Sequence, residues 1–316
     1  MLTAAAAGLA AAISRPGLAR MDMPANQAPY FYRFSLGDAR ATVVSDGPFP
    51  LGDPAGSFLG LSKEEITRQL TENFLPPNNV VLEQNILVIT IGNKTVLFDT
   101  GMGSVKAFGP TTGRLMPTLK TAGIDPAAVD AVILSHAHID HCGGIMSAAG
   151  RRNFPNAQIF IAKADYDYWT NESTVGPKLK SFYDQARKNL TPNLDRLHFV
   201  KDNEEFITGI TALSAPGHTV GHTVYMINSA GKSMCYIGDL THHPVLLMEK
   251  PLTEFAYDTD PKQSAQSRVR MLSMLASNRV PVLAYHFAWP GIGNVAKFND
   301  GFRYLPTPME IMKMPG

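Results

Sequence analysis

The chain has 316 residues, of which 45% are hydrophobic, and this is enough apolar material for a folded core and excludes a disordered protein. Its 28 basic and 27 acidic residues leave a net charge of +1, so nothing favours binding to a nucleic-acid backbone. The two cysteines, Cys142 and Cys235, cannot build a disulfide framework, and no Cys-x-x-Cys pair is present for a zinc ribbon.

The first 26 residues differ in composition from the rest of the chain. An Ala/Leu run at 2–13 precedes Ser14 and Arg15, as in the apolar part of an export signal. Because no positive charge precedes the run, a disordered alanine-rich tail is the alternative. We expect an exported, periplasmic protein in the first case and a cytoplasmic one otherwise. No other stretch nears the ~20 apolar residues of a membrane span, so we expect no span and a soluble mature protein.

From residue 30 onward, apolar runs alternate with helical patterns. Up to residue 135 we expect, in chain order, a hairpin of strands 32–36 and 40–45, a helix capped by Ser62 and stopped before Pro76, a hairpin of strands 80–91 and 95–99, helices at 115–122 and from 125, and a strand at 131–135. Beyond it we expect strands at 158–162, 196–200, 206–213, 223–227, 234–237 and 282–285, and helices at 164–169, 179–190 and 260–276. This order predicts one layered α/β domain over 30–316.

Residues 135–144, with the sequence SHAHIDHCGG, place three histidines and an aspartate within six positions. His136 and His138 lie two residues apart and can point the same way, whereas Asp140 and His141 can turn toward a neighbouring position. One short segment could therefore supply ligands to two adjacent metal ions. Imidazole and carboxylate ligands together suit zinc, iron or manganese. Gly143-Gly144 lets the backbone pack closely beneath the cluster. The alternative is a set of hydrogen-bonded core histidines without metal.

Three further candidate ligands, His218, Asp239 and His286, each follow a predicted strand. With them, the segment at 135–144 resembles the metallo-β-lactamase superfamily, whose His-x-His-x-Asp-His signature it matches in full. The resemblance implies an αββα sandwich in which two mixed β-sheets pack face to face with helices outside. It also implies two metal sites joined by Asp239, one held by His136, His138 and His218 and the other by Asp140, His141 and His286.

The resemblance assigns supporting roles to residues outside this ligand set. Asp99, in the sequence FDTG, matches a carboxylate that orients a metal-bound histidine, and His222 is expected to support the site or the fold. We expect Cys142 to be a packing residue and His198 to lie on the surface.

Two divalent cations per chain define the expected chemistry, with zinc favoured and manganese, iron or cobalt as alternatives. Such a pair lowers the pKa of a shared water and polarises a carbonyl or phosphoryl oxygen, so a bridging hydroxide can attack the substrate. Asp140 or Asp239 could take up or shuttle the proton. A serine hydrolase has little support because no Gly-x-Ser-x-Gly motif is present.

Within the superfamily, segments at 108–115, 215–223 and 286–293 are most similar to methyl parathion hydrolases and related lactonases. The ligand set differs from that of the β-lactamases, and too few residues follow His286 for the glutathione-binding domain of glyoxalase II. The family's aromatic substrate pocket maps onto Phe108, Trp169, Phe182 and Tyr183. Such a pocket suits a small neutral aryl ester, acyl lactone or phosphotriester, whereas the alternative is ordinary core packing.

The chain departs from methyl parathion hydrolase just after Asp239, where it reads LTHHP. Acyl-homoserine lactonases have a tyrosine near this point that assists the leaving group. We expect His242 to do so here as a proton donor or oxyanion contact, and the alternative is a surface or structural pair of His242 and His243.

Taken together, these patterns predict a dinuclear metal-dependent hydrolase of neutral esters or lactones. Phosphotriester hydrolysis is the first alternative, because the same pocket serves both reactions. A mononuclear iron enzyme similar to the sulfur dioxygenases and a non-catalytic binding module are further alternatives. The resemblance also suggests a homodimer.

Overall fold

The computed structural model describes residues 30–309, and its two largest elements are mixed seven-stranded sheets. In the first sheet the strands lie in the order β1 (Phe31–Leu36), β2 (Ala39–Ser45), β6 (Asn85–Ile91), β7 (Lys94–Phe98), β8 (Ala131–Ile133), β9 (Gln158–Ala162) and β10 (Leu197–Val200). Strands β7 to β10 run parallel, and the earlier pairs are antiparallel.

In the second sheet the order is β11 (Glu205–Ile207), β12 (Ile210–Ser214), β13 (Thr223–Ser229), β14 (Lys232–Tyr236), β16 (Val282–Leu283), β17 (Ile292–Phe298) and β18 (Gly301–Pro306). Only β14 and β16 pair in parallel. Two small sheets join β3 (Phe49–Gly52) to β5 (Val80–Leu82), and β4 (Phe58–Leu59) to β15 (Glu254–Phe255).

The main core lies between the two large sheets and is continuous across them. Val43, Ile89 and Leu97 from the first sheet belong to the same buried cluster as Tyr225 and Tyr236 from the second. Burial of this apolar surface is the main force that holds the sheets face to face. The two sheets thus share one core, and the domain range 30–316 stays a prediction.

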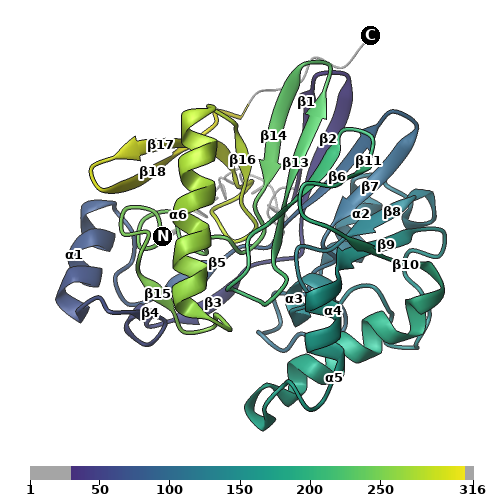
Figure 1. The fold of residues 1–316 in the computed structure, drawn as a ribbon, viewed down its shortest axis with the longest axis horizontal. Helices are drawn as coiled ribbons and strands as arrows, with labels where there is room; N and C mark the ends of the chain where they lie inside the picture. Colours follow the sequence, from purple (N-terminus) through teal and green to yellow (C-terminus); the bar gives the residue numbers. More distant parts are fainter. Residues whose placement is uncertain (1–29, 310–316) are drawn as a thin grey trace, which may run out of the picture.

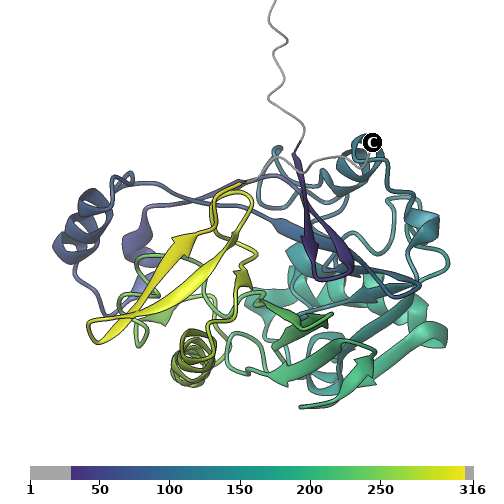
Figure 2. The same ribbon diagram turned by 90° about the horizontal axis from the view of Figure 1, so that it is seen from above.

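Helices flank both sheets: α1 (Lys63–Glu72), α2 (Leu115–Thr121), α3 (Ile139–Cys142), α4 (Lys163–Thr170), α5 (Lys180–Leu190) and α6 (Pro261–Ser277). Figure 1 shows α6 on the side of β16 to β18, with α2, α4 and α5 on the opposite side. Figure 2 looks down α6 and shows the β17–β18 hairpin beside it and α1 at the outer edge. The predicted αββα sandwich is therefore confirmed.

The helix signals in the sequence act as expected. Ser62 accepts a hydrogen bond from the backbone N–H of Glu65 at 3.1 Å, which begins α1. Asp260 does the same for Gln263 at 3.0 Å, and Pro261 follows it in the first turn of α6. These local bonds satisfy N–H groups that have no partner within the helix.

Two predicted strands are wrong because each is interrupted by a turn. The stretch 80–91 is split into β5 and β6, which belong to different sheets, since the chain bends at Glu83 and Gln84 beside the segment that carries His286. The stretch 206–213 is a tight hairpin of β11 and β12, and Gly209 at its turn has a φ of +83°.

Several short elements were not predicted: β3, β4, β15, the four-residue helix α3 and the C-terminal hairpin β17–β18. The predicted signal or disordered segment at 1–26 lies outside the described residues. Within residues 30–309, no helix combines the length and hydropathy that a membrane crossing requires.

Candidate metal centre

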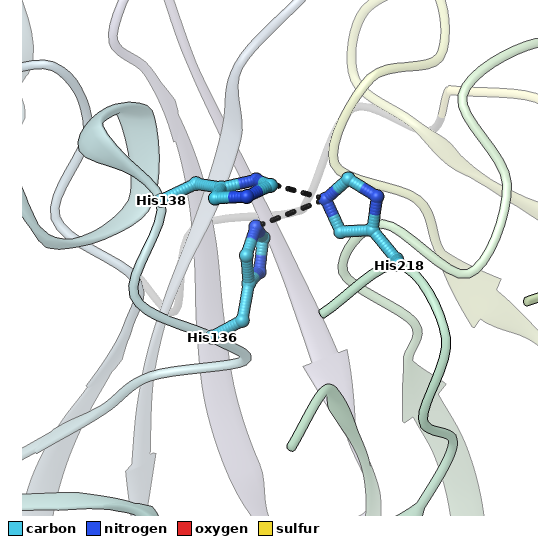
Figure 3. Close-up of side chains that lie close together, drawn as sticks. All are labelled: His136, His138 and His218. Atoms are coloured by element: carbon cyan, nitrogen blue, oxygen red, sulfur yellow. Dashed lines mark hydrogen bonds between the residues drawn. The ribbon is translucent and has the colours of Figure 1, made fainter. Parts of the chain in front are cut away.

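Three histidines from two separate loops converge near the ends of the sheets. His136 and His138 follow β8, and His218 lies in the turn between β12 and β13. His218 Nε2 lies 3.2 Å from His136 Nε2 and 3.0 Å from His138 Nδ1. Figure 3 shows the three rings pointing toward one another. Three buried ring nitrogens at this spacing could hold one metal ion; we call them the three-histidine group.

A second set of donors lies beside the first. Asp140 Oδ2 is 3.5 Å from His141 Nε2 and 3.6 Å from His286 Nε2. Asp140 and His141 belong to α3, and His286 follows β16 from the other sheet. These three residues, which we call the mixed group, also have donor atoms close enough to share one ion.

Asp239 lies between the two groups. Its Oδ2 is 3.2 Å from the Nε2 atoms of both His218 and His286, and its Oδ1 is 3.2 Å from His141 Nε2. Burial opposes ionisation of this carboxyl, but the surrounding imidazoles, above all His141, lower its pKa well below the usual range. The bridging position predicted for Asp239 therefore agrees with the geometry.

The second ring nitrogen of several histidines is fixed by an outer partner. His141 Nδ1 donates to Asp99 at 2.8 Å, His218 Nδ1 to Asp258 at 2.8 Å, and His286 Nδ1 to the carbonyl oxygen of Glu83 at 2.8 Å. Ionised carboxylates and carbonyls only accept hydrogen bonds, so Nδ1 carries the proton in each neutral ring. Burial opposes a charge on these rings, but the neighbouring carboxylates raise the pKa of His141 well above its usual range and that of His218 to about 9. A bound cation would take the place of the Nε2 proton, and each Nε2 would then present a lone pair to it.

These lone pairs are suited to a cation. His141 Nε2 and Asp239 Oδ1 are both buried and without a hydrogen-bond partner, although they face each other at 3.2 Å. Two ligands of one tetrahedral zinc, each 2.0–2.1 Å from the ion, would be about 3.3 Å apart. The residues present therefore fit divalent cations better than a set of core histidines held by hydrogen bonds.

Two supporting residues were predicted and one was missed. Asp99, beyond the end of β7, orients His141 as expected. His222 accepts a hydrogen bond from the backbone N–H of Asp239 at 3.0 Å, and burial lowers its pKa to about 3. Asp258, which orients His218, could not be identified because it is 40 residues away and has no motif around it.

The backbone beneath the cluster depends on the predicted glycine pair. A Cβ atom on Gly144 would lie 2.0 Å from the carbonyl oxygen of Thr100, a distance that no side chain can occupy. Thr100 in turn donates from its backbone N–H to the carbonyl oxygen of His141 at 2.6 Å. The glycine thus allows the loop after β7 to pack directly under the candidate ligands.

An open cavity of about 440 Å³ leads to the candidate ligands. Its walls are mainly apolar, with Phe49, Leu51, Leu82, Phe108, Trp169, Phe182 and Phe255 among the lining residues. His138, Asp140, His218, Asp239, His242 and His286 also line it. Among residues 30–177 and 179–309, no lysine, arginine or glutamate lines the cavity.

Of the four aromatic residues predicted for the substrate pocket, Phe108, Trp169 and Phe182 line the cavity and Tyr183 does not. Phe182 and Trp169 pack edge-on against His138, with ring centroids at 5.1 and 4.8 Å. Tyr183 does not line the cavity, because its position on α5 turns it into the main core, where its hydroxyl accepts from Arg187 at 2.8 Å.

His242 and His243 are both buried, so the surface alternative is wrong for this pair. His243 is structural, since its Nδ1 accepts from the backbone N–H groups of Val245 and Leu246 at 3.1 Å each. His242 lines the cavity, and its Nε2 lies 2.9 Å from Asp239 Oδ2. As predicted, Cys142 is buried and His198 is exposed.

Known sequences are similar to part of the chain. The chain is 31% identical to an N-acyl homoserine lactonase, AttM, of Rhizobium johnstonii over 116 residues, which are 34% of this chain and 40% of that protein. It is 25% identical to a β-lactamase-like protein 2 homolog of Drosophila melanogaster over 166 residues, covering 50% of this chain and 48% of the relative. The chain thus spans less than half the length of these relatives.

Solved structures match over almost the whole chain. AidC, a dizinc quorum-quenching lactonase in complex with a product, superposes with a TM-score of 0.83 at 30% identity, covering 90% of this chain and 98% of that one. AbOPH, a hydrolase in the β-lactamase superfamily, gives a TM-score of 0.84 at 25% identity, covering 90% of this chain and all of the other (100%).

The family model for the metallo-β-lactamase superfamily matches residues 80–285, a segment that includes His136, His218 and Asp239 and ends one residue before His286. This match covers more than half of the chain and agrees with the αββα sandwich and with the structural similarity to AidC. The chain belongs to the metallo-β-lactamase superfamily.

Proposed function

We propose that the chain is a metal-dependent hydrolase of neutral esters or lactones, with acyl lactones the favoured substrates. The observation that carries this proposal is the convergence of two donor groups and Asp239 at an apolar cavity. One divalent cation would be held by the three-histidine group, His136, His138 and His218. The other would be held by the mixed group, Asp140, His141 and His286. Asp239 would be a ligand of both. Zinc is the favoured metal because imidazole and carboxylate donors suit it and AidC is a dizinc enzyme.

The chemistry that divalent cations supply in such a site is polarisation of a carbonyl or phosphoryl oxygen and acidification of water. The chain's own groups would bind and orient the substrate and move the proton. Asp140 and Asp239 both line the cavity, so either carboxylate could take up a proton from attacking water. Outer partners such as Asp99 and Asp258 keep the ligand rings in the orientation that this requires.

His242 would assist the leaving group. Its ring lines the cavity and stacks on Phe255, with centroids 4.1 Å apart, so it is held in one plane beside the candidate ligands. Its Nδ1 has no hydrogen-bond partner, and its Nε2 lies beside Asp239. Because the Asp239 carboxylate only accepts hydrogen bonds, the Nε2–H is the group of the neutral ring that can donate a proton or a hydrogen bond to the alkoxide that forms when an ester or lactone opens.

The walls of the cavity support a neutral, apolar substrate. Outside the histidines and aspartates of the candidate centre, the side chains that line it are mainly aromatic and aliphatic, and such walls favour a neutral group. The product complex of AidC and the similarity to AttM support an acyl lactone. The aromatic wall of Phe108, Trp169 and Phe182 also suits an aryl leaving group, so aryl phosphotriesters are the second candidate substrates.

Metal analysis of the purified protein, combined with a panel of acyl lactones, aryl esters and aryl phosphotriesters, tests the proposal. We expect about two zinc ions per chain and the highest kcat/KM for a lactone. Turnover of phosphotriesters alone would reverse the order of substrates. One iron per chain with oxygen uptake in the presence of a thiol would favour a sulfur dioxygenase instead. Export and dimerisation stay predictions.

A further inference from the structure

A buried carboxylate at the start of α4 has no place in the function proposed above. Asp165 is completely buried, and both of its oxygens accept hydrogen bonds from backbone N–H groups. Oδ2 accepts from Ala137 at 2.6 Å and Oδ1 from Gly221 at 3.0 Å. One side chain on a helix therefore joins two loops that are far apart in the sequence.

Both loops carry candidate ligands of the three-histidine group. Ala137 lies between His136 and His138, and Gly221 lies three residues after His218. Every member of the three-histidine group is therefore close in the chain to a residue that Asp165 holds. The mixed group has supports of its own. Asp140 also lies three residues from Ala137 but belongs to the helical turn α3, Asp99 orients His141, and the carbonyl oxygen of Glu83 orients His286.

Other bonds between the loops hold different residues. The backbone N–H of Thr223 donates to the carbonyl oxygen of Ser135 at 3.0 Å. The hydroxyl of Tyr225 donates to the carbonyl oxygen of Leu134 at 2.7 Å. These bonds tie β13 to the end of β8. They reach neither Ala137 nor Gly221, so they cannot replace Asp165.

The loop of His218 packs directly on the helix at this point. A Cβ atom on Gly221 would lie 2.5 Å from the backbone nitrogen of Asp165 and 2.7 Å from its Cβ. Glycine at 221 thus permits the approach that brings its N–H to the carboxylate. Both partners of the side chain are donors, so a carboxylate satisfies them, whereas an amide would place its own NH₂ against one of them.

We propose that Asp165 is the positioning residue that sets the spacing of the three-histidine group, and this inference rests on the proposed function. Asp165 touches neither substrate nor metal; it fixes Ala137 and Gly221, and through them the directions of His136, His138 and His218. Its loss should therefore weaken zinc binding by this group and leave the mixed group almost unchanged.

The experiment measures zinc affinity in two backgrounds that each keep one group. His286→Ala keeps the three-histidine group, and His218→Ala keeps the mixed group. Zinc binding to the metal-free proteins is measured by competition with a chromophoric chelator. In the His286→Ala background we expect Asp165→Asn to weaken zinc binding by about 10- to 100-fold, the usual effect of losing an outer partner. In the His218→Ala background we expect a change of less than about 3-fold.

Asp46, which directly follows β2 of the first sheet, provides a matched control. It is also completely buried, and its carboxylate accepts from the backbone N–H groups of Met102, Gly113 and Leu115 at 2.8, 3.0 and 2.7 Å. None of these residues lies in a loop that carries the three-histidine group. Asp46→Asn should therefore leave the zinc affinity of the His286→Ala background, which keeps the three-histidine group, within about 3-fold, well below the effect of an outer partner.

Circular dichroism and thermal unfolding of the metal-free proteins show whether each variant folds. If Asp165→Asn does not fold, Asp165→Glu carries the test, with a smaller loss expected and only in the His286→Ala background. Unchanged affinity there, or equal losses in both backgrounds, would overturn the inference. If the two background variants bind as much zinc as the parent chain, the ligand assignment itself is wrong and the inference is overturned with it.

Discussion

The two halves of the molecule contribute to the candidate metal centre in different ways. The first sheet supplies four donors from one six-residue segment, His136 to His141, directly after β8. The second sheet supplies His218, Asp239 and His286 from three loops that are up to 68 residues apart in the chain (286 − 218). The first half thus provides a local motif, and the second half provides single residues that only the tertiary structure brings together.

This difference determines what holds the donors in place. In the first half, the helical turn of α3 and the glycine pair after it fix Asp140 and His141 over a short distance. In the second half, each donor needs a partner from elsewhere: Asp258 for His218, His222 for Asp239 and Glu83 for His286. The first half also uses outer partners, Asp99 for His141 and Asp165 for the loop of His136 and His138, so we expect changes outside the ligand set to matter in both halves.

The largest effect is expected at Asp239, where the halves meet. Asp239→Ala should lower kcat/KM by about 1,000-fold or more, because several kcal/mol of charge stabilisation are lost with a shared ligand. The zinc content should fall together with the activity. Steady-state kinetics and metal analysis of the same preparation check this, and a variant that keeps both would show that Asp239 does not join the groups.

The next effect concerns the leaving group. His242→Ala should lower kcat about 100-fold for an alkyl lactone, whose alkoxide needs a proton, and much less for a nitrophenyl ester. His243→Ala is the control, because His243 bonds only backbone N–H groups and should affect stability rather than the ratio of the two rates. Equal losses of kcat for both substrates would remove His242 from this role.

Asp258 tests the dependence of the second half on outer partners. Asp258→Asn should weaken zinc binding about 10- to 100-fold, because the neutral amide orients His218 less firmly and makes its ring less basic. The measurement is zinc affinity by chelator competition. An affinity equal to that of the parent chain would mean that His218 is held by its loop alone.

A buried carboxylate gives the first half a pH dependence of its own. Burial raises the pKa of Asp46 to about 7, above its unfolded value of 3.8. As the pH rises, the folded state therefore keeps this proton up to a higher pH than the unfolded state does. The stability contributed by this group is therefore present at low pH and is lost between about pH 4 and pH 7, at up to about 1.4 kcal/mol per pH unit. Chemical unfolding of metal-free parent and Asp46→Asn proteins should show this difference in slope.

The smallest effect is expected in the aromatic wall. Phe182→Ala should raise KM for an aryl ester about 10-fold, since removal of a ring that contacts the substrate costs roughly 1–1.5 kcal/mol. Tyr183→Phe is the adjacent control and should leave KM unchanged, because Tyr183 lies in the core. If the two variants alter KM equally, the cavity is not the substrate site.

The candidate ligands could be predicted from the sequence more completely than the residues that orient them. The dense motif at 136–141 is a local signal, and the family resemblance that it carries implied His218, Asp239, His286 and Asp99, which the structure brings close to it. Asp258 and Asp165 were missed, since a lone aspartate in a helix or loop carries no pattern that indicates what it will hold. Tyr183 was assigned wrongly because adjacent residues on a helix differ by about 100° in direction. The split of 80–91 was missed because nothing local marks where the chain changes sheets.

Anomalous diffraction at the zinc edge from crystals grown with zinc is the most direct test of the central claim. We predict two peaks per chain, one enclosed by His136, His138 and His218 and the other by Asp140, His141 and His286, with Asp239 between them. A single peak, or peaks bound by other residues, would contradict the account.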